Sequence, residues 1–103
     1  MKRGEAFKIT AGPCLAESMV LLDETAAELK RVMNNFKFDF YFKASYRKAN
    51  RSSINSYEGA GDKRALDWLG QIKEKYGLKI LTDIHSAEEA PMAAEIADVL
   101  QIP

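Results

Sequence analysis

The strongest constraint in this sequence is a regular alternation of short apolar segments with longer amphipathic segments. The apolar segments predict strands at residues 7–11, 38–44, 79–84 and 98–102. The amphipathic segments predict helices at residues 18–33, at about 62–76, and from Ser86 to about Ala97. An order of β-α-β-α-β-α-β favours a parallel sheet with right-handed crossovers, so we expect an α/β fold.

Local signals indicate where the predicted helices begin and end. Ser18 is expected to cap the first helix, and Gly77 is expected to stop the second. Ser86, with Glu89 three residues later, has the pattern of a capping box at the start of the third helix. Pro91 falls near the edge of the helical positions that tolerate proline.

The 103 residues hold three such βα units and a fourth strand that no helix follows. A (β/α)8 barrel needs about 250 residues. The pattern alone therefore fits either a small open sheet or the first part of such a barrel. We interpret residues 1–103 as one domain, because no linker, repeat or low-complexity segment divides them.

Charge and hydropathy exclude several classes of partner. The 15 Lys and Arg residues balance the 15 Asp and Glu residues, which argues against a nucleic-acid partner. No apolar run reaches the roughly 18 residues of a membrane span, and residues 1–10 lack the apolar stretch of a secretory signal. The single cysteine cannot form an internal disulfide. We therefore expect a cytoplasmic protein with no membrane partner.

Polar residues follow all four predicted strands, where parallel α/β folds place their chemistry. They are Gly12, Pro13, Cys14, Glu17 and Ser18 after the first strand; Lys43, Ser45, Lys48, Asn50, Arg51, Ser52 and Ser53 after the second; Asp83 and His85 after the third; and Gln101 after the fourth. We expect the functional site at this edge of the sheet.

Four cations lie within nine residues after the second strand: Lys43, Arg47, Lys48 and Arg51. Lysine supplies a point charge and arginine a bidentate fork, and together they suit phosphate and carboxylate groups. Such a run is equally typical of a solvated basic loop. The residues alone leave both interpretations open.

Three further residues have a structural and a chemical interpretation. A lone cysteine such as Cys14 is most often a small buried apolar residue, but its thiolate can also bind a divalent metal. A lone histidine such as His85 is usually structural. Asp83 could orient a lysine or cap the next helix instead of contacting a substrate.

The segments Phe42–Ser45 and Lys48–Ser53 read FKAS and KANRSS. They resemble the signature of the 3-deoxy-D-manno-octulosonate 8-phosphate (KDO8P) synthase family. The segments Ala-Gly-Pro-Cys at 11–14, Thr-Asp-Ile-His at 82–85 and Leu-Gln-Ile-Pro at 100–103 stand in the expected order around them. The related DAHP synthases share the Gly-Pro-Cys turn and the strand lysine but carry a Pro-Arg-Thr type of loop. The resemblance therefore favours KDO8P synthase.

The resemblance implies the N-terminal part of a TIM (β/α)8 barrel that condenses phosphoenolpyruvate with arabinose 5-phosphate, in lipopolysaccharide biosynthesis. Its members are typically cytoplasmic homotetramers. By resemblance, the catalytic residues are Lys48, Asn50 and Asp83. The substrate-binding residues would be Lys43, Ser45, Lys48 and Gln101 near phosphoenolpyruvate, and Asn50, Arg51 and Ser52 on the sugar phosphate.

The family has metal-dependent and metal-independent branches, with cysteine and asparagine respectively at the position of Cys14. Cys14 therefore predicts a divalent metal such as Fe²⁺, Mn²⁺ or Zn²⁺. The other ligands of the family, a His, a Glu and an Asp, belong to the second half of the barrel. We expect an incomplete metal site and no turnover from these 103 residues alone.

The chain departs from the family pattern at several positions. Tyr46 and Arg47 replace the usual Phe-Asp pair, Asn55 stands where His is common, and Glu58 stands where Arg is common. Two other functions stay open: a DAHP synthase-like enzyme that uses erythrose 4-phosphate, and a small non-catalytic α/β module that binds phosphate.

Overall fold

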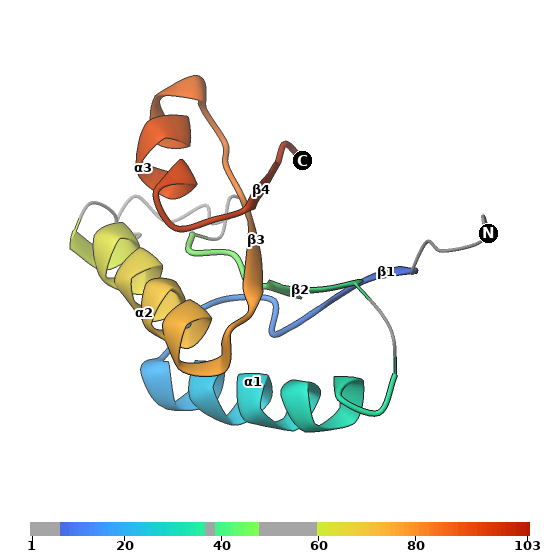
Figure 1. Cartoon of the computed structure of the whole chain (residues 1–103). Helices are drawn as coiled ribbons and strands as arrows, with labels where there is room; N and C mark the ends of the chain where they lie inside the picture. Colours follow the sequence, from blue (N-terminus) through green and yellow to red (C-terminus); the bar gives the residue numbers. More distant parts are fainter. Residues whose placement is uncertain (1–6, 37–38, 48–59) are drawn as a thin grey trace.

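The computed structural model describes residues 7–36, 39–47 and 60–103 (Figure 1). The elements are β1 (Lys8–Ala11), α1 (Met19–Met33), β2 (Asp39–Lys43), α2 (Ala60–Tyr76), β3 (Lys79–Asp83), the 3₁₀ helix η1 (Ala87–Glu89), α3 (Ala90–Ala94) and β4 (Val99–Gln101). All strand pairs are parallel, in the order β1-β2-β3-β4. The α/β fold class is confirmed. The four strands are consistent with part of a barrel, and the closed barrel stays a prediction.

Helices α1 and α2 lie on the same side of the sheet (Figure 1). Successive strand residues point to opposite faces, and the face toward these helices is the buried one. Phe42, Ile80 and Thr82 are fully buried there. The helices contribute the apolar side chains of Leu22, Ala26, Ala65, Leu66, Leu69 and Ile72, and Trp68 and Tyr76 pack against this core.

The predicted cap at the start of the first helix and the predicted stop of the second helix are both confirmed. The Ser18 hydroxyl accepts the Leu21 N–H at 3.1 Å and so caps α1. Gly77 follows α2 with φ +63°, a conformation that glycine adopts without steric cost. Helix α2 begins at Ala60, two residues before the expected start, so Asp62 lies within its first turn.

The prediction of one continuous third helix up to Ala97 is wrong. Pro91 has no N–H to donate to the Ala87 carbonyl, and the Ala90 N–H bonds to that carbonyl instead. The first turn is therefore the 3₁₀ helix η1, and α3 ends at Ala94.

Within the part of the chain that the structure describes, no helix is long and apolar enough to span a membrane.

Candidate functional site

The segments after β1 and β2 are joined through their backbones. Ser45 forms a parallel bridge with Leu15. The Ser45 N–H donates to the Cys14 carbonyl at 3.2 Å, and the Ala16 N–H donates to the Ser45 carbonyl at 2.8 Å. The residues that follow both strands are therefore held side by side.

Strand register brings residues from three strands into one row. Asp83 pairs with Gln101, and the Ile84 N–H donates to the Gln101 carbonyl at 3.0 Å. Lys43 pairs with Leu81. Ser45 and Asp83 each follow this pair by two residues, so they lie level with each other. Ser45, Asp83 and Gln101 thus form one row across the carboxyl edge of the sheet, and Lys43 lies one strand repeat before it.

This row faces away from the helices. Phe42 and Thr82 are buried on the helix side of the sheet. Because side chains alternate along each strand, Lys43, Ser45 and Asp83 lie on the opposite face. Lys43 and Ser45 are partly exposed there. Lys43, Ser45, Asp83 and Gln101 therefore share one face and one edge of the sheet.

Gly12 sets how closely the segment after β1 approaches β2. A Cβ atom at Gly12 would lie 1.9 Å from the Lys43 carbonyl oxygen. No other residue fits at this distance without a shift of the backbone, so glycine is required for a steric reason. The close approach keeps the Gly12–Cys14 segment against the peptide of Lys43.

Asp83 and His85 form a mostly buried polar pair on the site face. His85 Nε2 lies 3.5 Å from Asp83 Oδ2, and the side chains are 19% and 14% exposed. Among the residues that the structure describes, neither Asp83 Oδ1 nor His85 Nε2 has a hydrogen-bond partner. A buried polar atom without a partner costs about 1–3 kcal/mol. This cost favours a polar group of a ligand, or water, beside Asp83 Oδ1 and His85 Nε2.

The segments after β2 and β3 meet at the carboxylate of Glu89, whose side chain is only 9% exposed. The Tyr46 hydroxyl donates to Oε1, and Arg47 Nη2 lies 3.2 Å from the same oxygen. Oε2 accepts the Ser86 hydroxyl at 3.0 Å and the His85 N–H at 3.3 Å. One buried carboxylate therefore receives donors from both segments.

The pKa shifts of Glu89 and Tyr46 agree with these contacts. Burial alone would raise the pKa of Glu89, but the hydrogen bonds from Tyr46 and Ser86 and the charge of Arg47 lower it overall. Burial and the hydrogen bond to Glu89 raise the pKa of Tyr46, so its hydroxyl stays a donor. Glu89 is consequently an ionised acceptor at neutral pH.

Arg47 also contacts a second buried carboxylate. Its Nε lies 3.1 Å from Asp62 Oδ2, and the Asp62 side chain is 7% exposed. Arg47 therefore bridges α2 and η1, two elements that are distant in sequence. Ser86 is the N-cap residue, as predicted, but the capping box is not formed: Ser86 makes no side-chain cap bond and donates to Glu89 instead.

Cys14 is exposed, so its interpretation as a small buried apolar residue is wrong. Its thiol is available at the edge where a metal is predicted. In residues 7–36, 39–47 and 60–103, however, no three His, Cys, Asp or Glu side chains are grouped closely enough to hold a metal ion. The described donor set does not fit a complete metal site.

Several predicted residues lie outside the described residues. These are the candidate site residues Lys48, Asn50, Arg51 and Ser52, and two departures from the family pattern, Asn55 and Glu58.

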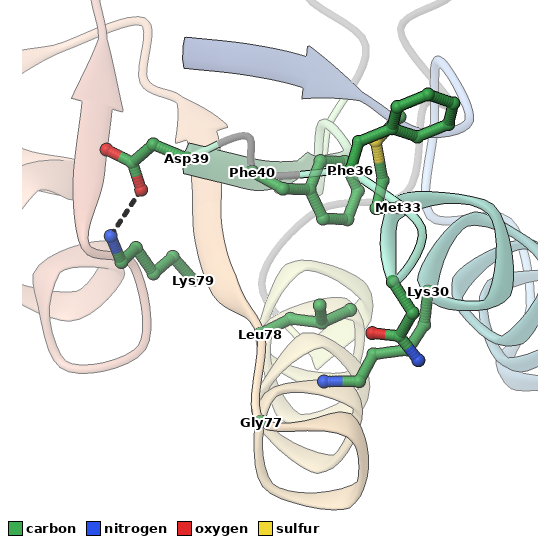
Figure 2. A pocket seen from close by; sticks show the side chains of 9 residues that line it. Lys30, Met33, Phe36, Asp39, Phe40, Gly77, Leu78 and Lys79 are labelled. Atoms are coloured by element: carbon green, nitrogen blue, oxygen red, sulfur yellow. Dashed lines mark hydrogen bonds and ion pairs between the residues drawn. The ribbon is translucent and has the colours of Figure 1, made fainter. Parts of the chain in front are cut away.

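A pocket of about 360 Å³ lies at the opposite edge of the sheet, between the end of α1 and the starts of β2 and β3 (Figure 2). Its lining combines apolar and charged side chains: Lys30, Met33, Asn34, Phe36, Asp39, Phe40, Gly77, Leu78 and Lys79. It shares no residue with the row at the carboxyl edge.

Comparison with known proteins agrees with the resemblance. A profile of the DAHP synthetase I family matches residues 2–103. The chain is 48% identical over 95 residues to a 2-dehydro-3-deoxyphosphooctonate aldolase of Wolinella succinogenes, which covers 92% of this chain and 36% of the relative. Proteins of the same name from Helicobacter pylori and Campylobacter jejuni are 50% and 48% identical over 95 residues. The chain spans about one third of the length of these curated relatives, with 36%, 34% and 35% covered.

Proposed function

The chain belongs to the DAHP synthetase I family, and from this membership we propose that the protein is a KDO8P synthase. It would condense phosphoenolpyruvate with arabinose 5-phosphate to KDO 8-phosphate and inorganic phosphate. The name of its relatives, 2-dehydro-3-deoxyphosphooctonate aldolase, denotes this activity. The structural observation that carries the proposal is the row of Ser45, Asp83 and Gln101 with Lys43 beside it.

The proposed reaction needs positive charge at the site. C3 of phosphoenolpyruvate attacks the aldehyde carbon, water adds at C2, and the C2–O bond of the resulting hemiketal phosphate breaks to release phosphate. Lys43 is proposed to hold the phosphate or carboxylate of phosphoenolpyruvate, with Ser45 and Gln101 nearby. A fixed cation stabilises the charge that develops during such a reaction. Asp83 would accept a hydrogen bond at the reacting aldehyde end.

The remaining substrate contacts are proposed from the KANRSS motif. Lys48 would complete the phosphoenolpyruvate site, and Asn50, Arg51 and Ser52 would bind the sugar phosphate. Guanidinium and hydroxyl donors are the groups that phosphate oxygens accept bonds from.

We also propose Cys14 as one ligand of a divalent metal, Fe²⁺, Mn²⁺ or Zn²⁺. Its exposed thiol supports this role. Metal content measured by mass spectrometry checks it directly, because Cys14→Asn should lower the bound metal per protein. An unchanged metal content would exclude Cys14 as a ligand. The homotetramer and the cytoplasmic location stay predictions.

Release of phosphate tests the proposed reaction, with the protein as its gene encodes it. Arabinose 5-phosphate and phosphoenolpyruvate together should release phosphate, and erythrose 4-phosphate should not replace the sugar. Lys43→Met should lower kcat/KM by about 10²–10³-fold, as expected for loss of a charge-stabilising group. Lys30→Met, which removes a cation at the opposite edge, is the matched control and should leave kcat/KM unchanged.

Two other outcomes would replace the proposal. A preference for erythrose 4-phosphate would assign the protein to the DAHP synthase activity. Calorimetric binding of phosphoenolpyruvate with no phosphate release would favour a non-catalytic binding module.

A further inference from the structure

We propose that Glu89 is a positioning residue that sets the spacing between the two halves of the site. It would hold the segment carrying Lys43 and Ser45 at a fixed distance from the segment carrying Asp83. This inference rests on the proposed function, because the spacing matters for bringing two substrates together.

Glu89 contacts both of these segments. Tyr46 directly follows Ser45, and both Tyr46 and Arg47 contact Oε1. His85 is two residues after Asp83, and its N–H bonds to Oε2. Each oxygen of one rigid carboxylate therefore reaches the segment of a different strand.

Burial makes these contacts stiff. The side chains of Glu89 and Asp62 are 9% and 7% exposed, and Arg47 lies between them. Removing one member of a buried charge pair leaves an uncompensated charge, which costs far more than breaking an exposed pair. We therefore expect the two segments to keep a fixed spacing as long as Glu89 accepts these hydrogen bonds.

The test variant is Glu89→Gln, which keeps the size of the side chain. All four partners of Glu89 are donors, and an amide offers one accepting oxygen and one donating nitrogen. The Tyr46 and Ser86 hydroxyls can turn to accept a hydrogen bond, but Arg47 and the His85 N–H can only donate. Glutamine therefore leaves one of these two donors, and so one segment, without its acceptor. We expect kcat to fall by about 10–100-fold, the scale of a misplacement near 1 Å, while KM for each substrate changes little.

Controls separate positioning from folding. Glu95→Gln removes an exposed carboxylate just after α3 and should leave kcat unchanged. The double variant Arg47→Met/Glu89→Gln should lose less than the product of the two single losses, because both changes break one contact. A purely structural role would lower the melting temperature and leave kcat of the folded enzyme within twofold of the parent; that result overturns the inference.

Amide hydrogen exchange decides the inference even without turnover. If the unmodified protein is inactive, the proposed function is wrong, but hydrogen exchange still measures whether the two segments are coupled. Glu89→Gln should speed exchange of the Ser45 N–H, which bonds to the Cys14 carbonyl, as well as exchange at His85. Faster exchange at His85 alone would show that the two segments are independent and would refute the positioning role.

Discussion

The two edges of the sheet use charged side chains in opposite ways. At the carboxyl edge, Arg47 joins Asp62 and Glu89, whose side chains are nearly buried. At the amino edge, Lys79 pairs with Asp39, and the lysine is 53% exposed. Buried charges are stable only where all partners are present, whereas exposed pairs contribute little. The comparison indicates that charge at the carboxyl edge maintains geometry and charge at the amino edge keeps the surface solvated.

The largest difference in stability between the two edges is expected when one glycine at each edge is replaced by alanine. Gly12→Ala would drive a Cβ into the Lys43 carbonyl, and we expect a loss of about 3 kcal/mol or more of unfolding free energy, the upper range of overpacking. Gly77→Ala meets open space and only strains a positive φ, at a cost of about 1–2 kcal/mol. Urea unfolding measures both values.

Equal losses at the two positions would contradict the steric argument. In that case the approach of Gly12 to Lys43 would be looser than the structure shows. Gly70→Ala, which meets only the end of the Ile96 side chain at 3.0 Å, provides an intermediate reference.

A smaller difference in unfolding free energy is expected when a side-chain hydrogen bond is changed at each edge. Thr82 is fully buried, and its hydroxyl donates to the Ala44 carbonyl at 2.7 Å. Thr82→Val should cost about 1–2 kcal/mol of unfolding free energy. At the amino edge, Asp98 accepts the Ile80 N–H at 2.8 Å. Asp98→Asn keeps that acceptor and loses only a partly exposed ion pair with Lys73, so it should cost less. The reverse order in urea unfolding would refute the comparison.

Acid should weaken the carboxyl edge through Glu89. Burial opposes ionisation of Glu89, but its hydrogen bonds and Arg47 lower its pKa below the ordinary value of 4.5. A group with a lowered folded pKa stabilises the fold at neutral pH, and this stabilisation is lost as the pH falls below 4.5. The parent should therefore lose unfolding free energy more steeply below that pH than Glu89→Gln. Parallel curves for the two proteins would show that Glu89 is not the titrating group.

The smallest effect should be seen at the exposed pairs of the amino edge. Lys79→Gln removes the partner of Asp39 and should leave the melting temperature nearly unchanged. Salt near 1 M, where charges are screened beyond about 3 Å, should likewise change the parent little. A strong salt dependence that disappears in Lys79→Gln would mean that the amino edge carries more stability than its exposure indicates.

Local structure was largely predictable from the sequence, because it depends on residues within about one helical turn. The Ser18 cap and the Gly77 stop are such signals. Pro91 was visible in the sequence, but its effect was not predicted: the first turn of the third helix is 3₁₀ because Pro91 has no N–H to donate. The contacts of Arg47 with Asp62 and Glu89 were not predictable, because they join elements that only the tertiary fold brings together.

The placement of the candidate site residues in the fold was predictable in part, while their roles stay predictions. Strand ends and the family motif led to Lys43, Ser45, Asp83 and Gln101, and register now explains why three of them form a row. The exposure of Cys14 went against the usual burial of a lone cysteine. Periodicity could not reveal it, since the turn after Gly12 and the backbone of Ser45 decide where Cys14 lies.

The row across the sheet also limits how this chain can change length during evolution. Side chains alternate with a period of two, so one inserted residue within β3 would turn Asp83 toward the helices and bring its buried neighbour onto the site face. The same insertion in the turn between α2 and β3 would leave the register of every strand intact. Related sequences should therefore differ in length between the elements and keep the strands ungapped.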